Sequence, residues 1–275
     1  MTRIQHGQAE GAQEEAHRAG SPAAALGGKS PYDVIGNSYR QTRREDARIR
    51  AAIWEAIGDA TSVVNVGAGT GSYEPPQTLL AVEPSITMIA QRGPNLAPAT
   101  LTTADRIPLR DKSVDVALAV LTIHWWSDRE AAFRELRRVA RRAVIFTWDL
   151  EVSRTFWLMD YFPEILDTDA KIAVPISWLR ETLGTDDVRV VVIPYDCADG
   201  FLGAYWRRPE AYLDPLVRSN ISAFARLGAS AAIDRGLSEL ARDLRDGSWR
   251  HRHQDLLSMD SLDIGYRLVV AEWDA

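Results

Sequence analysis

A short apolar strand that runs straight into three closely spaced glycines constrains this sequence more than any other feature. Residues 62–66, Ser-Val-Val-Asn-Val, predict a buried parallel strand, and Gly67, Ala68, Gly69, Thr70 and Gly71 follow it directly. Glycine at such a point lets the backbone turn sharply and approach a ligand closely. Glu83 ends the next apolar run, where a carboxylate typically accepts hydrogen bonds from a ribose diol. Together these residues predict a ribose-containing ligand at the carboxyl edge of a parallel sheet.

The spacing of the glycines discriminates between two kinds of ligand. A dinucleotide fingerprint reads G-x-G-x-x-G and sets a pyrophosphate at a helix N-terminus. Here the third glycine comes one residue early, and Ser72 occupies the later position. G-x-G-x-G followed by an acidic strand end fits S-adenosylmethionine (SAM) better, because SAM has no pyrophosphate. An NAD-dependent oxidoreductase is the less favoured alternative, which titration with the two cofactors separates.

Apolar runs alternate with helical patterns along the rest of the chain, which predicts an α/β fold with a mostly parallel sheet. One early helix carries Ile49, Ile53, Trp54 and Ile57 on one predicted face. The predicted strands are 62–66, 79–82, a short one at Leu101, 114–120, 143–148, 188–193 and 266–272. The predicted helices are 42–57, 85–91, 129–138 and 176–183.

The same reading divides the chain into four parts. Residues 1–30 are rich in Ala, Gly, Gln and Glu and predict a flexible tail. We expect the core fold over 31–196 and its last strand in 263–275. Residues 197–262 read as helical and aromatic-rich, and we interpret them as an insertion that forms a lid over a substrate.

Composition limits the possible partners. The 275 residues carry a net charge of −6, so we expect no nucleic-acid partner. No apolar run approaches the ~20 residues that span a bilayer, and no secretion signal is evident, so we expect a cytoplasmic protein without membrane contact. Cys197 is the only cysteine, which excludes internal disulfides, and the Arg250-His251-Arg252-His253 run lacks the companions of a metal site, so we expect no metal. We expect a monomer or a homodimer.

Several stretches together resemble the class I SAM-dependent methyltransferases, in particular the type 11, small-molecule branch. The stretches that carry the resemblance are Gly67–Gly71, Val82–Met88, Thr103–Leu109, Ser113–Val116 and Leu121–Trp125. The resemblance implies a Rossmann-like sheet of seven strands, mostly parallel with an antiparallel last strand, to which a helical lid insertion is added. It also implies SAM as cofactor and S-adenosylhomocysteine (SAH) as product.

The resemblance further implies which residues bind the cofactor. Glu83 would hold the ribose hydroxyls, Ala104 would offer its backbone N–H to the adenine, and Leu121 would lie near the sulfonium. The complete implied set is Gly67, Ala68, Gly69, Gly71, Glu83, Pro84, Ser85, Thr103, Ala104, Asp105, Leu121 and Arg43.

The sequence departs from the family pattern at two points. Thr103 stands where many relatives carry an acid for the adenine amino group, so only a hydroxyl is offered there. Only eleven residues separate Gly71 from Glu83, and they include Pro75 and Pro76. Because proline inside a helix costs about 3 kcal/mol, we expect a short turn in place of the first crossover helix, with residues 72–74 as an irregular loop by the cofactor.

Candidate residues for the transfer itself follow the fourth strand. His124 suits general-base work near neutral pH, and Trp125 could offer an indole N–H to an acceptor oxygen. We add Tyr39 from the segment before the fold. Trp126 reads as the tryptophan that packs under the following helix. The predicted activity is methylation of a small organic acceptor, such as a secondary metabolite, with oxygen favoured over nitrogen or carbon. A SAM-binding enzyme that catalyses another reaction, such as a cyclisation, is the alternative.

Overall fold

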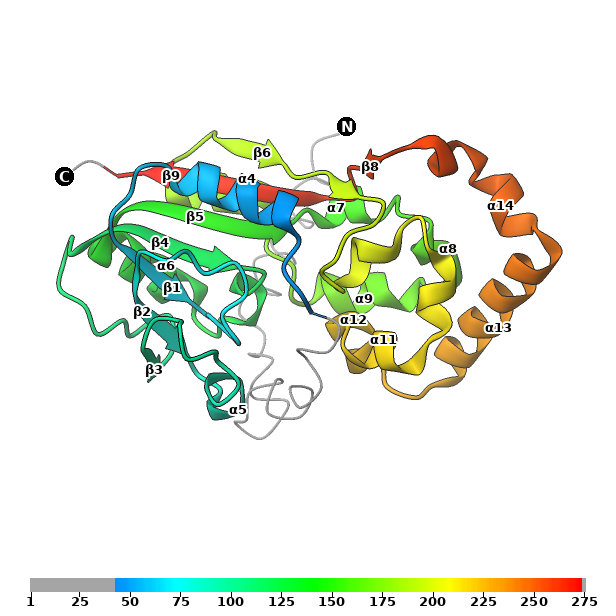
Figure 1. Ribbon diagram of the computed structural model, residues 1–275, viewed down its shortest axis with the longest axis horizontal. Helices are drawn as coiled ribbons and strands as arrows, with labels where there is room; N and C mark the ends of the chain where they lie inside the picture. Colours follow the sequence, from blue (N-terminus) through cyan, green and yellow to red (C-terminus); the bar gives the residue numbers. More distant parts are fainter. Residues whose placement is uncertain (1–42, 274–275) are drawn as a thin grey trace, which may run out of the picture.

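The computed structural model describes residues 43–273, and within them a seven-stranded sheet forms the centre of the fold (Figure 1). Its strand order is β3-β2-β1-β4-β5-β9-β6, in which β1 to β5 are parallel and β9 runs antiparallel to both neighbours. The predicted fold class is confirmed. The strands are β1 Val63–Val66, β2 Thr78–Glu83, β3 Ala99–Leu101, β4 Val114–Val120, β5 Ala140–Trp148, β6 Val188–Val190 and β9 Tyr266–Glu272. The tail 1–30 and Tyr39 lie outside the described residues.

Each face of the sheet buries a separate apolar core. On one face Ile49, Ile53 and Ile57 of α4 (Ala47–Ile57) pack against alternate strand residues such as Val116 and Val144. On the other face α6 (Arg129–Val139) and α10 (Ile176–Leu183) cover the intervening strand residues. The alternation follows from the strand pleat, which points successive side chains to opposite faces. Trp54, predicted on the buried face of α4, is instead 37% exposed and donates its indole N–H to the Tyr73 carbonyl.

Local signals explain where the core helices begin and end. The Asp46 carboxylate accepts from the Arg48 backbone N–H at the start of α4, and Asp128 accepts from the Ala131 N–H at the start of α6. Gly184 ends α10 in the left-handed region, at φ 68°. Among the described residues, no helix is both long and apolar enough to cross a bilayer.

The link from β1 to β2 contains turns and no helix, as the two prolines predict. Tyr73 lies at its centre, with φ 64° and a fully buried side chain. A left-handed backbone is costly for a bulky residue, so neighbouring contacts must hold it in place.

The second half of the chain builds a helical region beside one end of the sheet (Figure 1). The short α8 (Leu158–Tyr161) and α9 (Glu164–Ala170) precede the predicted insertion, yet they pack against α13 and α12 within it. The core that lies under α4 continues into this region through residues such as Phe162 and Trp206. The remaining elements there are α7 Leu150–Ser153, η4 Leu202–Tyr205, η5 Pro209–Leu213, α11 Pro215–Ser219, α12 Ser222–Leu227, α13 Ala231–Asp246, α14 Ser248–Arg252 and η6 Gln254–Ser258.

The predicted strand 188–193 is two strands in the structure. β6 ends at Val190, and β7 (Ile193–Pro194) leaves the main sheet to pair with β8 (Ser261–Leu262). β7 and β8 therefore bring together the two ends of residues 195–260, which form most of the helical region. The other predicted strands match within a few residues, and α5 (Ile86–Ile89) is the short form of the helix predicted over 85–91.

Candidate functional site

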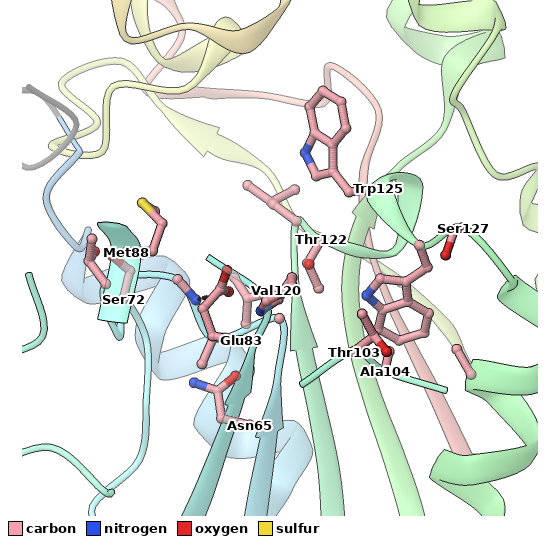
Figure 2. Close-up of a pocket in the computed structure, with 18 of the residues that line it drawn as sticks. Asn65, Ser72, Glu83, Met88, Thr103, Ala104, Val120, Thr122, Trp125 and Ser127 are labelled. Atoms are coloured by element: carbon pink, nitrogen blue, oxygen red, sulfur yellow. Dashed lines mark hydrogen bonds between the residues drawn. The ribbon is translucent and has the colours of Figure 1, made fainter. Parts of the chain in front are cut away.

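A cavity of about 230 Å³ opens at the carboxyl ends of β1, β2 and β4, and we call it the strand-end cavity (Figure 2). Carboxyl ends of parallel strands are where open α/β sheets bind ligands. It is lined by Arg43, Asn65, Gly67–Thr70, Ser72, Tyr73, Glu83, Pro84, Met88, Thr103–Asp105, Val120–Thr122, Trp125–Asp128 and Ala132.

Glu83 is the buried acid of this cavity, with 4% of its surface exposed. One carboxylate oxygen accepts from the Gly69 N–H at 2.8 Å, and the other accepts from the Ser85 N–H at 2.9 Å. The carboxylate therefore ties the glycine loop to the end of β2. In Figure 2 the Glu83 side chain lies above Asn65 and next to Val120.

The three glycines have different tasks. Gly67 has φ 70°, and a Cβ there would lie 2.0 Å from the Thr122 hydroxyl. Gly69 has φ 53° and faces the Met88 side chain. Gly71 does not line the cavity, because it faces Leu96, which a Cβ would meet at 2.3 Å. Gly71 therefore packs against Leu96, and its contact with a cofactor stays a prediction.

Ser85 also lies outside the cavity lining. It is fully buried, its hydroxyl caps α5 through the Met88 N–H, and its own N–H supports Glu83. Its place is thus behind the site, where it positions the acid. The remaining ten residues of the predicted cofactor set all line the cavity.

The irregular loop after Gly71 is held by a buried acid. Glu74 accepts from the Asn65 side chain at 2.9 Å, from Arg92 at 2.8 Å and from the Ala97 N–H at 2.9 Å. Ser72 and Tyr73 line the cavity as predicted, whereas Glu74 turns away from it. Hydrogen bonds of Glu74 therefore hold the loop where the family pattern would have a helix.

A second buried network joins this loop to the helical region. The Tyr73 hydroxyl donates to Asp199 at 2.9 Å, and Arg43 Nε donates to the same carboxylate at 2.5 Å. The Glu45 carboxylate accepts from the Tyr73 N–H at 2.5 Å, which helps to fix the left-handed backbone. No sequence motif marks Asp199 as a functional residue. Its partners are 126 and 156 positions away, so no local pattern could have found it.

A smaller cavity of about 80 Å³ lies between the sheet edge and the helical region, and we call it the helical cavity. It shares Arg43 and Leu121 with the strand-end cavity. Leu121 follows β4 with φ 48°, an uncommon conformation at the point where the two cavities meet. The helical cavity is lined by Arg43, Leu121, His124, Trp148, Ser153, Phe156, Met159, Asp169, Phe201–Gly203, Ile221–Ala223, Arg226, Ile264 and Tyr266.

The predicted catalytic pair divides between the two cavities. His124 lines the helical cavity and Trp125 lines the strand-end cavity, although they are consecutive in η3 (Ile123–Trp125). Burial, together with the charges of Arg226 and Arg129, lowers the pKa of His124 well below its usual value of 6.5. The imidazole is therefore neutral at neutral pH. Trp126 packs on Phe133 of α6, as predicted, and also lines the strand-end cavity.

The chain is similar to known methyltransferases in both sequence and fold. Residues 64–147 match a family described as "Methyltransferase domain". A solved structure from Anabaena variabilis, described as a methyltransferase from an antibiotic biosynthesis pathway, is 35% identical, with a TM-score of 0.75 over 84% of this chain and 99% of that chain. The plantazolicin methyltransferase BpumL, solved with SAH, is 11% identical with a TM-score of 0.53 over 98% of this chain and 100% of its own, a likeness of fold alone.

A curated relative adds a partial match. An uncharacterised methyltransferase-like protein of Schizosaccharomyces pombe is 32% identical over 97 residues, which span 32% of this chain and 37% of the relative. The match covers only that part of the yeast protein. Taken with the near-complete Anabaena match, these findings establish that the chain belongs to the SAM-dependent methyltransferases, with SAM as its cofactor. The oxidoreductase alternative is thereby set aside.

The cavity offers what SAM requires. Gly67 and Gly69 turn the backbone along its wall at positive φ, and Glu83 supplies a buried carboxylate at the strand end. Glu83, Asp105 and Asp128 line it with acidic side chains, which suits a cationic ligand. No cluster of three or more metal-ligating side chains occurs within residues 43–273.

Proposed function

We propose that this methyltransferase transfers the methyl group of SAM to a small organic acceptor, with the cofactor in the strand-end cavity and the acceptor in the helical cavity. The observation that carries the proposal is the junction at Leu121 and Arg43, which line both cavities. Methyl transfer is an in-line displacement, so the acceptor atom must reach the methyl group from the side opposite the sulfur. Two adjoining cavities of unequal size meet that requirement.

In this proposal the cofactor residues keep the roles that the family resemblance implies. Glu83 holds the ribose diol, Ala104 offers its N–H to the adenine beside Pro84, and Leu121 contacts the methyl-bearing end. Bound SAM supplies a methyl carbon activated by its sulfonium, so the protein mainly aligns and shields the reacting atoms. Thr103 and Asp105 extend the adenine side, and the backbone at Gly67–Gly69 faces the methionine part.

Arg43 has a shared role in the proposal. Its guanidinium contacts Asp199 through two nitrogens, so this carboxylate competes with the carboxylate of SAM for the same cation. We propose that Arg43 links cofactor binding to the helical region through this competition. We assign the lid function to the 197–262 insertion together with α8 and α9, which pack on it.

The acceptor class in the proposal is a small molecule, with oxygen as the favoured atom. The cavity assigned to it is small and mostly apolar, which suits an organic metabolite better than a polymer. The Anabaena protein is described as part of an antibiotic biosynthesis pathway, and this supports a secondary metabolite as acceptor. The net charge of −6 favours a small molecule over a nucleic acid as the acceptor.

The test has two stages. Calorimetric titration of the full chain with SAM should give binding at micromolar or better affinity, and Gly69→Arg should abolish it. Incubation with labelled SAM and a metabolite extract should then release SAH together with a labelled product. Turnover of an acceptor without SAH release would point to a reaction such as a cyclisation and would overturn methyl transfer.

A further inference from the structure

Three polar groups of the helical cavity lack hydrogen-bond partners among the described residues. They are His124 Nδ1, Trp148 Nε1 and Arg226 Nε, and each of these atoms is buried. His124 has only 4% of its surface exposed, so water reaches its ring little. Buried polar groups are almost always hydrogen-bonded, and an unmet donor costs free energy. All three side chains line one cavity, so a single ligand could satisfy them.

The three groups come together from distant parts of the chain. Trp148 ends β5, and its ring lies 4.4 Å from that of His124, edge to face. The Arg226 guanidinium, from α12, lies 5.6 Å from the Trp125 ring, which in turn lies 4.9 Å from His124. Sheet and helical region therefore contribute to one polar cluster at the side of the cavity that adjoins the cofactor.

The chemistry of the cluster favours an anionic oxygen. Arg226 and Trp148 present N–H donors only, and a neutral imidazole can donate through one nitrogen. The acid in the cavity lining, Asp169, already forms an ion pair with Arg226. A guanidinium with a further donor and two ring N–H groups suits a carboxylate, which has two acceptor oxygens.

The rest of the lining limits the body of the ligand. Phe156, Met159, Ile221 and Ile264 contribute apolar walls. A cavity of about 80 Å³ admits a small ring or a short branched chain. The ligand is thus expected to combine one acidic head with a compact apolar body.

A strong base is missing from the same lining. Burial and neighbouring cations keep His124 a poor proton acceptor, because its protonated form is disfavoured. Asp169 is engaged by Arg226, and burial raises the pKa of the Tyr266 hydroxyl. An acceptor that arrives already ionised needs none of these groups as a base.

We propose that the acceptor is a small carboxylic acid with an apolar body, held as its anion by Arg226, Trp148 and His124 and methylated on a carboxylate oxygen. This rests on the proposed function, which assigns the helical cavity to the acceptor. A carboxylate lone pair forms the new O–CH₃ bond while the C–S bond of SAM breaks and its electron pair passes to sulfur. The anion and the sulfonium become a neutral methyl ester and the neutral thioether SAH, and no proton is released. In this role His124 is a positioning donor.

The experiment that tests this proposal uses SAM labelled in its methyl group. The full-length enzyme is incubated with small aromatic and branched aliphatic carboxylic acids, and separately with their primary amides and corresponding alcohols. SAH formation reports methyl transfer of any kind, and label released as volatile methanol in mild base reports a carboxyl methyl ester. We expect base-labile label with acids only. SAH with base-stable label would overturn the carboxylate proposal and leave methyl transfer intact, whereas SAM that fails to bind in calorimetry would overturn the proposed function itself.

Variants then test each donor on an acid that is turned over. Arg226→Gln combined with Asp169→Asn removes the guanidinium without leaving the Asp169 carboxylate buried and unpaired. This double variant should raise the KM for the substrate acid about tenfold or more, while the Kd for SAH changes little. Trp148→Phe removes one N–H and should raise KM by about threefold to tenfold. Arg245→Gln, at an exposed arginine of α13, is the matched control. An unchanged KM in both cavity variants would overturn the assignment.

His124→Gln separates positioning from base catalysis. Glutamine keeps a donor but cannot take up the proton, so we expect kcat to fall less than about tenfold, with kcat/KM showing no titration of an enzyme base between pH 6 and 9. Loss of a general base typically costs about 10²- to 10⁴-fold. A loss of that size, with SAM binding retained, would contradict the proposal.

Discussion

The two cavities differ in how their polar groups are satisfied. In the strand-end cavity the buried acid Glu83 already accepts two backbone N–H groups, and the loop beside it is fixed by Glu74. In the helical cavity His124, Trp148 and Arg226 each keep a buried polar atom without a partner within residues 43–273. One site is organised by its own protein groups, and the other has polar groups to offer to a ligand.

Under the proposed function, this difference separates cofactor binding and acceptor binding between two regions of the fold. The cofactor is the same in every turnover, so its site can be built from backbone and from the strand ends of a rigid sheet. The proposed acceptor side is built from side chains of a strand end, a 3-10 turn and a helix that lie far apart in the sequence. Substitutions in the first region should therefore act on SAM binding, and substitutions in the second on the acceptor.

The largest expected effect is that of Gly69→Arg. Gly69 has φ 53° and donates to Glu83, so a side chain there disturbs both the backbone and the acid. We expect the Kd for SAM to rise at least about 100-fold, equivalent to about 2.8 kcal/mol. Calorimetry on the variant measures it. Gly93→Arg, where a Cβ meets nothing within 4 Å, is the matched control. Normal SAM affinity in Gly69→Arg would show that the glycine loop is not part of the SAM site.

Glu83→Gln should have the next largest effect on SAM binding. Glutamine retains one acceptor oxygen but loses the charge, and hydrogen bonds to charged groups contribute about 1.5–3 kcal/mol. We expect the Kd for SAM to rise about 10- to 100-fold, while the affinity for a bound carboxylic acid changes much less. The exposed Glu55→Gln on α4 serves as control. If the affinity for the carboxylic acid ligand fell as much as the affinity for SAM, the proposal that the two ligands occupy separate cavities would be wrong.

Tyr73→Phe tests the link between the regions. The hydroxyl donates to the buried Asp199 and accepts from the Asp46 N–H at 3.3 Å, so its removal leaves polar groups short of a partner. We expect the free energy of unfolding in urea to fall by about 1–3 kcal/mol. Tyr205→Phe, on η4, provides the comparison. A loss below about 0.5 kcal/mol would show that the link contributes little to stability.

The smallest effect concerns pH. Because the folded pKa of His124 lies below 6.5, the unfolded chain binds a proton there that the folded chain does not, once the pH falls below 6.5. Stability should therefore decrease as pH falls through this range, by up to about 1.36 kcal/mol per pH unit for this one group. Urea unfolding at pH 5.0 to 7.5 measures the slope. His124→Gln should remove the contribution of this one group from the slope. His251→Gln on α14 is the control. An identical slope in His124→Gln would argue against a buried neutral imidazole.

The sheet and the cofactor side could be predicted because their signals are local. The apolar run of β1, the glycine spacing and the acid at the end of β2 all lie within residues 63–83, and the two prolines predict that the crossover has no helix. Gly71 and Ser85 belong to the same motifs as the lining residues but do not line the cavity, because motif position does not determine which way a residue faces. The contacts of Leu96 and of the α5 cap decide that, and both come from packing.

The helical cavity could be predicted only in outline. His124 is a predictable member because it follows a strand, but Arg226 and Asp169 are 57 positions apart and carry no motif. Their pairing depends on how α12 packs on α9, a tertiary contact between two short helices. Trp148 had a usable signal, since it ends β5 beside the strand that leads to His124.

The position of β9 has a consequence for how the protein is made. This strand pairs with β5 on one side and β6 on the other, yet it follows the entire helical region in the sequence. During synthesis β5 and β6 must therefore wait with unpaired edges while more than seventy further residues leave the ribosome. Ile264 and Tyr266, which adjoin or begin this strand, also complete the helical cavity. The nascent chain can thus assemble the strand-end cavity early, but the helical cavity only when the last strand inserts.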